Sequence, residues 1–137
     1  MPLRRRNSRL SAADRELVAA ARAVIRRGFI REKHHVGAAL RTGAGKIFTG
    51  LHLEPYVGRL AVCAEAGAIS AAAVAGERTI ESIVAARYTG QVISPCGGCR
   101  ELIADFAPRA RVIVPGPKGL RAVPIARLLP KKCRKSH

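Results

Sequence analysis

Apolar residues near the start of the chain recur every three or four positions. Ser11 and Asp14 stand at the beginning of this pattern in the arrangement of a capping box, and Gly28 stands at its end. The spacing predicts a helix over residues 11–27 that buries one face. The apolar positions are Leu10, Leu17, Ala21, Val24 and Ile25, and the arginines on another face are Arg15, Arg22 and Arg26.

The next apolar segments are either short or almost uniform in composition. Residues 36–40 and 46–53 are short apolar runs on either side of the glycine-rich segment 42–45, which predicts a β-hairpin. Residues 63–75 consist almost entirely of Ala, Val, Ile and Gly, and Gly76 follows them. Because this segment has no polar face, we expect a central helix that is buried on every side.

The second half of the chain alternates between strand and helix signals. Residues 80–88 and 111–114 are expected to form strands, and residues 96–106 are expected to form a helix after Pro95. A short terminal helix is expected over residues 123–129. Taken with the first half, this order predicts a three-layer α/β/α sandwich with a mixed central sheet of about five strands.

Length and composition set the scale of the fold. The chain has 137 residues, 48% of them hydrophobic, which suffices for one domain with its own core. We expect one domain over residues 1–137, with basic extensions at about 1–9 and 131–137. The arginine-rich start has no apolar stretch behind it, and no run approaches the roughly 20 apolar residues of a membrane span. These features predict a cytoplasmic protein.

The net charge of +16 is concentrated at the two ends of the sequence. Residues 1–33 and 118–137 each carry a net +7, whereas residues 34–117 carry +2. Basic ends can bind a phosphate backbone, or they can form a solvated, solubilising surface. Aromatic residues make up only 4% of the chain, so the stacking platforms of single-strand binders are scarce. Nucleic-acid binding therefore stays an alternative and is not the main expectation.

Three of the four cysteines stand at the starts of two predicted helices. Cys63 opens one helix, and Cys96 and Cys99 open the other in a Cys-x-x-Cys arrangement, which favours metal binding over disulfides in a chain without an export signal. The positive end of a helix dipole favours a thiolate, so two such helices can direct three thiolates at one ion. Three protein ligands leave the fourth position of a tetrahedral Zn²⁺ open, which is typical of a catalytic site.

The remaining donor groups decide what such a metal does. Glu65 follows Cys63 by two residues, so we predict that its carboxylate lies beside the metal and acts as general acid and base toward a water molecule. Cys133 provides the alternative, because a fourth thiolate would close the site and make the metal structural. Its position in the basic tail argues against that alternative.

The residues 63–65 and 95–99 together read Cys-Ala-Glu and Pro-Cys-Gly-Gly-Cys, which is the signature of zinc deaminases with cysteine as the first ligand. Over residues 34–130 the chain resembles the cytidine deaminase family. The resemblance implies a cytidine deaminase-like fold, Zn²⁺ as cofactor, and Cys63, Cys96 and Cys99 as its ligands. The other segments that carry it are Val36-Gly37-Ala38-Ala39-Leu40, a turn at Thr49-Gly50, Glu54, Ser94, Arg100 and Leu128-Leu129-Pro130.

The same resemblance implies a reaction and an assembly. Glu65 would take a proton from the water that attacks the amino-bearing ring carbon, then protonate the ring nitrogen and the departing amine, so that ammonia leaves. Glu54 would hydrogen-bond a ribose hydroxyl. The family further implies a homotetramer whose subunits share their sites, and a place in pyrimidine salvage.

The sequence departs from the family pattern at three positions that bear on the substrate. His52 replaces an Asn that makes a second ribose contact, His34 replaces a base-contacting Phe, and Ala66 replaces an Arg that eases the charge of the thiolates. The blasticidin S deaminases, a related branch that acts on a cytosine-containing antibiotic, also lack that Arg. The residues implied at the substrate are Glu54, His52, His34 and Ala64, and those implied to support the metal ligands are Arg100 and Pro95.

Three classes of function follow from these observations. The first is hydrolytic deamination of a cytidine-like nucleoside, and the second is deamination of a cytosine-containing antibiotic or a modified base. The third is a non-enzymatic, zinc-stabilised protein that binds nucleic acid through its basic ends. For Arg100 the sequence leaves two roles open, contact with the thiolates or a surface cap.

Overall fold

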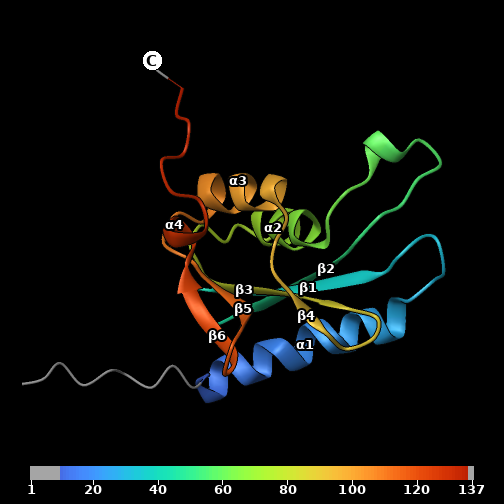
Figure 1. Cartoon of the computed structure of the whole chain (residues 1–137), viewed down its shortest axis with the longest axis horizontal. Helices are drawn as coiled ribbons and strands as arrows, with labels where there is room; N and C mark the ends of the chain where they lie inside the picture. The colour runs from blue at the N-terminus through green and yellow to red at the C-terminus, as the bar shows by residue number, and fades with distance from the viewer. Residues whose placement is uncertain (1–9, 136–137) are drawn as a thin grey trace, which may run out of the picture.

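The computed structural model describes residues 10–135, so the predicted extension at residues 1–9 lies outside the described part (Figure 1). Within this range a six-stranded mixed sheet has α1 on one face and α2, α3 and α4 on the other (Figure 1). This arrangement confirms the predicted three-layer α/β/α class. The elements are α1 Ala12–Gly28, β1 Val36–Thr42, β2 Ile47–Leu51, a 3₁₀ turn Gly58–Leu60, α2 Ala64–Val74, β3 Ile80–Arg87, β4 Val92–Ile93, α3 Gly97–Phe106, β5 Arg111–Gly116, β6 Gly119–Pro124 and α4 Ile125–Leu128.

The sheet has the strand order β2-β1-β3-β5-β6, with the short β4 beside β3. Only β3 and β5 are parallel, and the other pairs are antiparallel. The sheet has six strands because β4 and β6 add to those expected, and the predicted helix over 123–129 starts only at Ile125. Val123 and Pro124 instead pair with β5, since Gly119, at a φ of 105°, turns the chain back into a hairpin.

α1 packs on the sheet through the apolar face that its periodicity predicts. Leu17, Ala21 and Ile25 are buried, and the Ser11 hydroxyl accepts a hydrogen bond from the Asp14 N–H at 3.1 Å, which confirms the predicted cap. Gly37 of β1 permits the close approach, because a Cβ there would lie 2.7 Å from Val24 Cγ1.

α2 departs from the prediction that it is buried on every side. Ala64, Ala68 and Ala72 are buried against the sheet, but Ala73 is exposed and Val74 is 88% exposed. The composition of the helix shows that it lacks a polar face. The composition does not show whether another element of the chain packs against each face of the helix. Within the described residues, no element packs against its outer face.

The predicted turn at Thr49-Gly50 is wrong, because both residues lie inside β2. Glycine is needed at position 50 for packing, because β2 and α2 touch there. A Cβ on Gly50 would lie 2.4 Å from both the carbonyl oxygen of Ala64 and the backbone nitrogen of Ala68. The same contact fixes the start of α2, which carries Cys63 and Glu65.

Gly50→Ala should therefore destabilise the protein by about 1–3 kcal/mol in the free energy of unfolding, because backbone atoms of α2 must move to admit the methyl group. Urea unfolding measures this loss. Gly58→Ala is the matched control, since a Cβ at Gly58 meets nothing within 4 Å. Equal losses at the two positions would contradict a close contact between β2 and α2.

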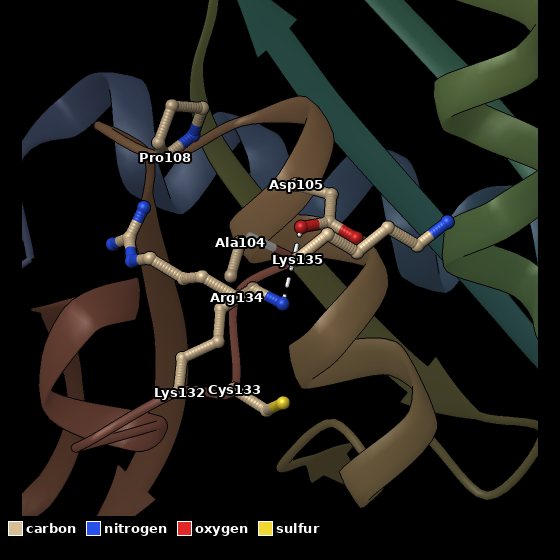
Figure 2. A pocket seen from close by; sticks show the side chains of 7 residues that line it. All are labelled: Ala104, Asp105, Pro108, Lys132, Cys133, Arg134 and Lys135. Carbon is tan, nitrogen blue, oxygen red and sulfur yellow. Dashed lines mark ion pairs between the residues drawn. The ribbon is translucent and has the colours of Figure 1, made fainter. Parts of the chain in front are cut away.

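Within residues 131–135, the basic tail contacts α3 through Lys132. Lys132 pairs with Asp105 at 3.1 Å (Figure 2). It also pairs with Glu101. These ion pairs place the positive charge of Lys132 next to two acidic residues of α3. No helix in residues 10–135 is both long and apolar enough to cross a membrane.

Candidate active site

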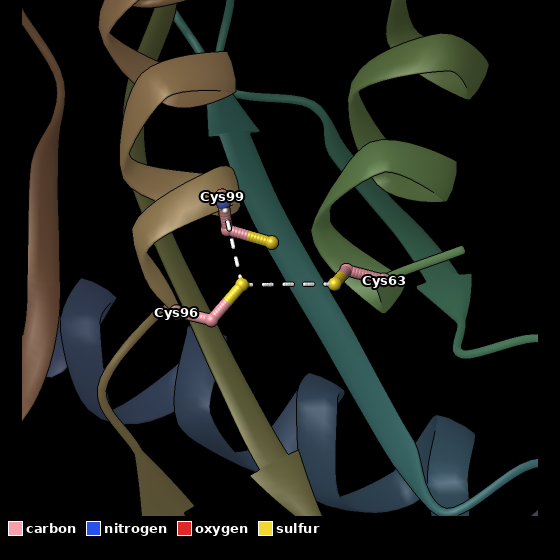
Figure 3. A group of neighbouring side chains, drawn as sticks. All are labelled: Cys63, Cys96 and Cys99. Carbon is pink, nitrogen blue, oxygen red and sulfur yellow. Dashed lines mark hydrogen bonds between the residues drawn. The ribbon is translucent and has the colours of Figure 1, made fainter. Parts of the chain in front are cut away.

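The three cysteines of the predicted metal site converge from two helix starts (Figure 3). Cys63 caps the N-terminus of α2, Cys96 caps that of α3, and Cys99 lies in the first turn of α3. Their sulfur atoms all lie within 4.8 Å of one another, and those of Cys63 and Cys96 are 3.9 Å apart. Sulfurs bound to one tetrahedral zinc at 2.3 Å lie about 3.8 Å apart, so the donor set fits this ion.

The surroundings of the three thiols differ. The N–H of Cys99 donates to Cys96 Sγ at 3.4 Å, and this bond lowers the pKa of Cys96 because it stabilises the thiolate. Burial raises the pKa of Cys63. Burial, followed by the charge of Glu65, raises the pKa of Cys99. A metal that binds all three sulfurs therefore displaces protons from the two thiols whose pKa is raised.

Glu65 lies in the first turn of α2 with its side chain directed at this group. It is only 5% exposed, and the thiol of Cys99 donates to its Oε2 at 3.5 Å. Ile93, Pro95 and Ile103 lie beside it. A buried carboxylate in contact with one of the three thiols can accept a proton from a water at the same point and return it to a bound molecule.

Arg100 holds the loop that leads into α3. Its Nε donates to the carbonyl of Pro95 at 3.0 Å, and its Nη1 donates to the carbonyl of Leu128 at 3.1 Å. The guanidinium thus ties the residue before Cys96 to the end of α4. These bonds go to carbonyl groups and describe a bridge between two segments, which is neither of the two roles left open from the sequence.

The predicted substrate residues fall into two places. Ala64 is completely buried, between Cys63 and Glu65. His34, His52 and Glu54 lie together where β1 begins and β2 ends. His34 Nδ1 donates to the carbonyl of His52 at 2.7 Å, and His52 Nε2 lies 2.7 Å from Glu54 Oε2.

This second group lies close to the cysteines along the backbone. Leu53 and Val62 form an antiparallel bridge with two hydrogen bonds, and Val62 immediately precedes Cys63. A further member of this group is His35, whose backbone N–H donates to His52 Nδ1 at 3.1 Å. Its position next to His34 was the available signal, but the pairing becomes visible only with the register of β1 and β2.

Cys133 lies elsewhere. It borders a cavity of about 760 Å³ at the C-terminal end of α3, with Ala104, Asp105 and Pro108, whereas Cys96 and Cys99 are at the N-terminal end (Figure 2). In the described residues the group of converging donors consists of Cys63, Cys96 and Cys99 without Cys133. This geometry favours an open metal site over a closed one.

Comparison with known proteins agrees with the site. Residues 11–115 match the family model described as the cytidine and deoxycytidylate deaminase zinc-binding region. The chain is 42% identical over 131 residues to a blasticidin-S deaminase of Bacillus cereus, covering 90% of this chain and 94% of the relative. It is 34% identical over 100 residues to a cytidine deaminase of Sporosarcina psychrophila, covering 72% and 74% of the two chains.

Solved structures show the same likeness. The crystal structure of cytidine deaminase from Burkholderia pseudomallei matches with a TM-score of 0.73 and 30% identity, over 89% of this chain and 98% of that one. That from Mycobacterium leprae matches with a TM-score of 0.73 and 29% identity, over 85% and 97%. The fold and the site thus define a zinc-dependent hydrolytic deaminase. The chain belongs to the cytidine and deoxycytidylate deaminase family, as its sequence motifs predicted.

Proposed function

We propose that this protein hydrolyses the exocyclic amino group of a cytosine nucleoside, with Cys63, Cys96 and Cys99 as zinc ligands and Glu65 as the acid and base. One observation carries the proposal: three sulfurs lie within 4.8 Å of one another, and the buried Glu65 carboxylate is 3.5 Å from one of them. A structural metal site would require neither the buried acid nor an open position.

Zinc, when bound, supplies a Lewis acid that makes water a better nucleophile near neutral pH. The protein supplies the proton transfers. As the water oxygen adds to the amino-bearing ring carbon, Glu65 takes one of its protons and passes it to the ring nitrogen. The carbon–nitrogen bond then breaks while the amine takes the second proton through Glu65, so ammonia leaves and a ring carbonyl remains.

A second candidate substrate is a cytosine-containing antibiotic such as blasticidin S. The 42% identity to a blasticidin-S deaminase over nearly the whole chain favours it, and so does Ala66, because the blasticidin S deaminases also lack an Arg at that position. Both candidates share the ring chemistry and differ in what is attached to the base. Cysteine ligation and the role of Glu65 are the same in both.

Ammonia release across aminated substrates tests the proposal and separates the two candidates. The zinc-loaded protein is assayed with cytidine, deoxycytidine, cytosine, adenosine and blasticidin S. We expect release from cytosine compounds that carry a sugar, with the ratio of cytidine to blasticidin S identifying the preferred one. No release from any of them, with one zinc per chain verified, would reject the proposal.

We also propose that the protein is a homotetramer, located in the cytoplasm and active in pyrimidine salvage. Support for assembly comes from apolar side chains exposed on one chain: Val74 on the outer face of α2, and Tyr56 and Leu60 in the segment before Cys63. Burial of such side chains favours association. Sedimentation velocity of the purified protein gives the number of subunits.

Basic residues at the chain ends raise the nucleic-acid alternative. Deletion of residues 1–9, which include four arginines, should weaken any binding to RNA and reduce its salt dependence, because phosphate contacts release counterions. Turnover of a small nucleoside should stay unchanged. Binding is measured by fluorescence anisotropy at several salt concentrations, and loss of nucleoside turnover would instead place this arm at the active site.

A further inference from the structure

We infer that His52 is a positioning residue that holds the Glu54 carboxylate toward a sugar hydroxyl, and that it does not itself contact the substrate through a ring nitrogen. The inference rests on the proposed function for the identity of the substrate. It departs from the expectation that His52 takes over the sugar contact made by Asn in the family.

The hydrogen bonds fix the tautomer of His52. The backbone N–H of His35 can only donate, so His52 Nδ1, at 3.1 Å, accepts and carries no hydrogen. The hydrogen of the neutral ring is then on Nε2, which donates to Glu54 Oε2 at 2.7 Å. Both ring nitrogens are engaged within the protein, which leaves neither for a substrate.

Glu54 is more exposed than His52, as expected if the carboxylate meets the substrate and the histidine only positions it. The side chain of His52 is 16% exposed and that of Glu54 is 40% exposed. The carboxylate is therefore the member of the pair that a substrate can reach. A carboxylate has two oxygens, so when one accepts from His52 the other can accept from a hydroxyl group.

His35, which donates to His52, is fixed by hydrogen bonds of its own. His35 Nε2 accepts a hydrogen bond from the Glu32 N–H at 2.8 Å, and the His35 carbonyl accepts from the Tyr88 N–H at 2.9 Å. The rings of His35 and His52 have centroids 5.5 Å apart. The donor to His52 Nδ1 is thus fixed by the turn that precedes β1 and by the end of β3.

Glu54 is also fixed through its backbone. Its N–H donates to the carbonyl of Lys33 at 2.9 Å, and the adjacent Leu53 pairs with Val62 beside Cys63. Main chain and carboxylate are therefore both anchored, at a place that adjoins the metal ligands. Such a preorganised acceptor favours substrates that carry a hydroxyl, because those without one leave it unpaired.

Two substitutions separate positioning from direct contact. The amide nitrogen of Gln in His52→Gln can reach the place of Nε2 and donate to Glu54, whereas the shorter amide in His52→Asn can reach only the place of Nδ1. We expect His52→Asn to raise KM for cytidine by about 10- to 100-fold, the cost of one hydrogen bond with a charged group, with little change in kcat. His52→Gln should recover most of this loss.

The substrate and a second site supply the controls. With 2′,3′-dideoxycytidine, which lacks the 2′ and 3′ hydroxyls of the sugar, His52→Asn should leave KM unchanged if Glu54 accepts from one of these two hydroxyls. In Glu54→Ala, adding His52→Asn should cause no further rise in KM for cytidine, because the positioned group is gone. Additive effects of the two substitutions would overturn the inference in favour of a direct contact by His52.

Nitrogen NMR of the histidine rings gives a readout that does not need activity. We expect His52 to show a bare Nδ1 and a protonated Nε2, and its Nε2 resonance to shift in Glu54→Ala. The opposite tautomer, or no shift in that variant, would overturn the inference whatever the kinetics. Failure of the wild type to release ammonia from cytidine and blasticidin S would reject the proposed function while the NMR result still decides whether His52 holds Glu54.

Discussion

Glu65→Gln should lower the rate of deamination by about 10²–10⁴-fold, the usual cost of losing a general acid and base. Glutamine has nearly the same size as glutamate, so the packing of this buried side chain is kept. It cannot take and return a proton. Steady-state ammonia release, measured together with zinc content, gives the effect.

The same substitution at Glu81 is the matched control, because Glu81 is exposed on β3, outside the candidate site. Its turnover should equal that of the wild type. A Glu65→Gln protein with one zinc per chain and an undiminished rate on its best substrate would remove Glu65 from the mechanism. Thermal unfolding of both variants verifies that the fold is retained.

Cys96→Ala should abolish stoichiometric zinc binding and destabilise the protein. Cys96 is the thiol whose pKa is lowered, and it lies 3.9 Å from the sulfur of Cys63, so its loss leaves a pair of ligands in place of three. A ligand that binds only the folded state adds about 3 kcal/mol to the free energy of unfolding at 100 times its Kd. The variant should lose at least that amount in zinc-containing buffer.

Cys133→Ser serves as its control, since Cys133 lies at the opposite end of α3. Zinc content, measured by atomic emission after dialysis, should match that of the wild type. Zinc loss in Cys133→Ser would mean that the tail closes the site, and the open coordination position would be lost with it. Equal unfolding curves of Cys96→Ala with and without zinc would support the proposed ligand set.

Local patterns predicted most of the helices and strands, because their signals lie within a few residues of one another. The cap at Ser11, the hairpin of β1 and β2 and the starts of α2 and α3 are of this kind. β4 could not be predicted, since a strand of two residues is defined by its partner β3. β6 was obscured because its Val123 also fits the apolar pattern of the helix that follows.

In the candidate site, the metal ligands and Glu65 could be predicted from local patterns, whereas the hydrogen bonds of His52 could not. Cys63 and Glu65 share one helical turn, and Cys96 and Cys99 share another, so their convergence needed only two helix starts that face one point. The bonds of His52 depend on the register that places Leu51 opposite Gly37. A shift by one residue would turn the ring to the other side of the sheet, and no local pattern fixes that register.

X-ray absorption at the zinc edge on the purified wild-type protein tests the central claim, that three thiolates hold a zinc with one position free for chemistry, without knowledge of the substrate. We expect three sulfur neighbours at about 2.3 Å and one lighter neighbour at about 2.0 Å. The spectrum of Cys133→Ser should be identical. Four sulfur neighbours, reduced to three in Cys133→Ser, would show a closed structural site and contradict the assignment of this protein as a catalytic zinc deaminase.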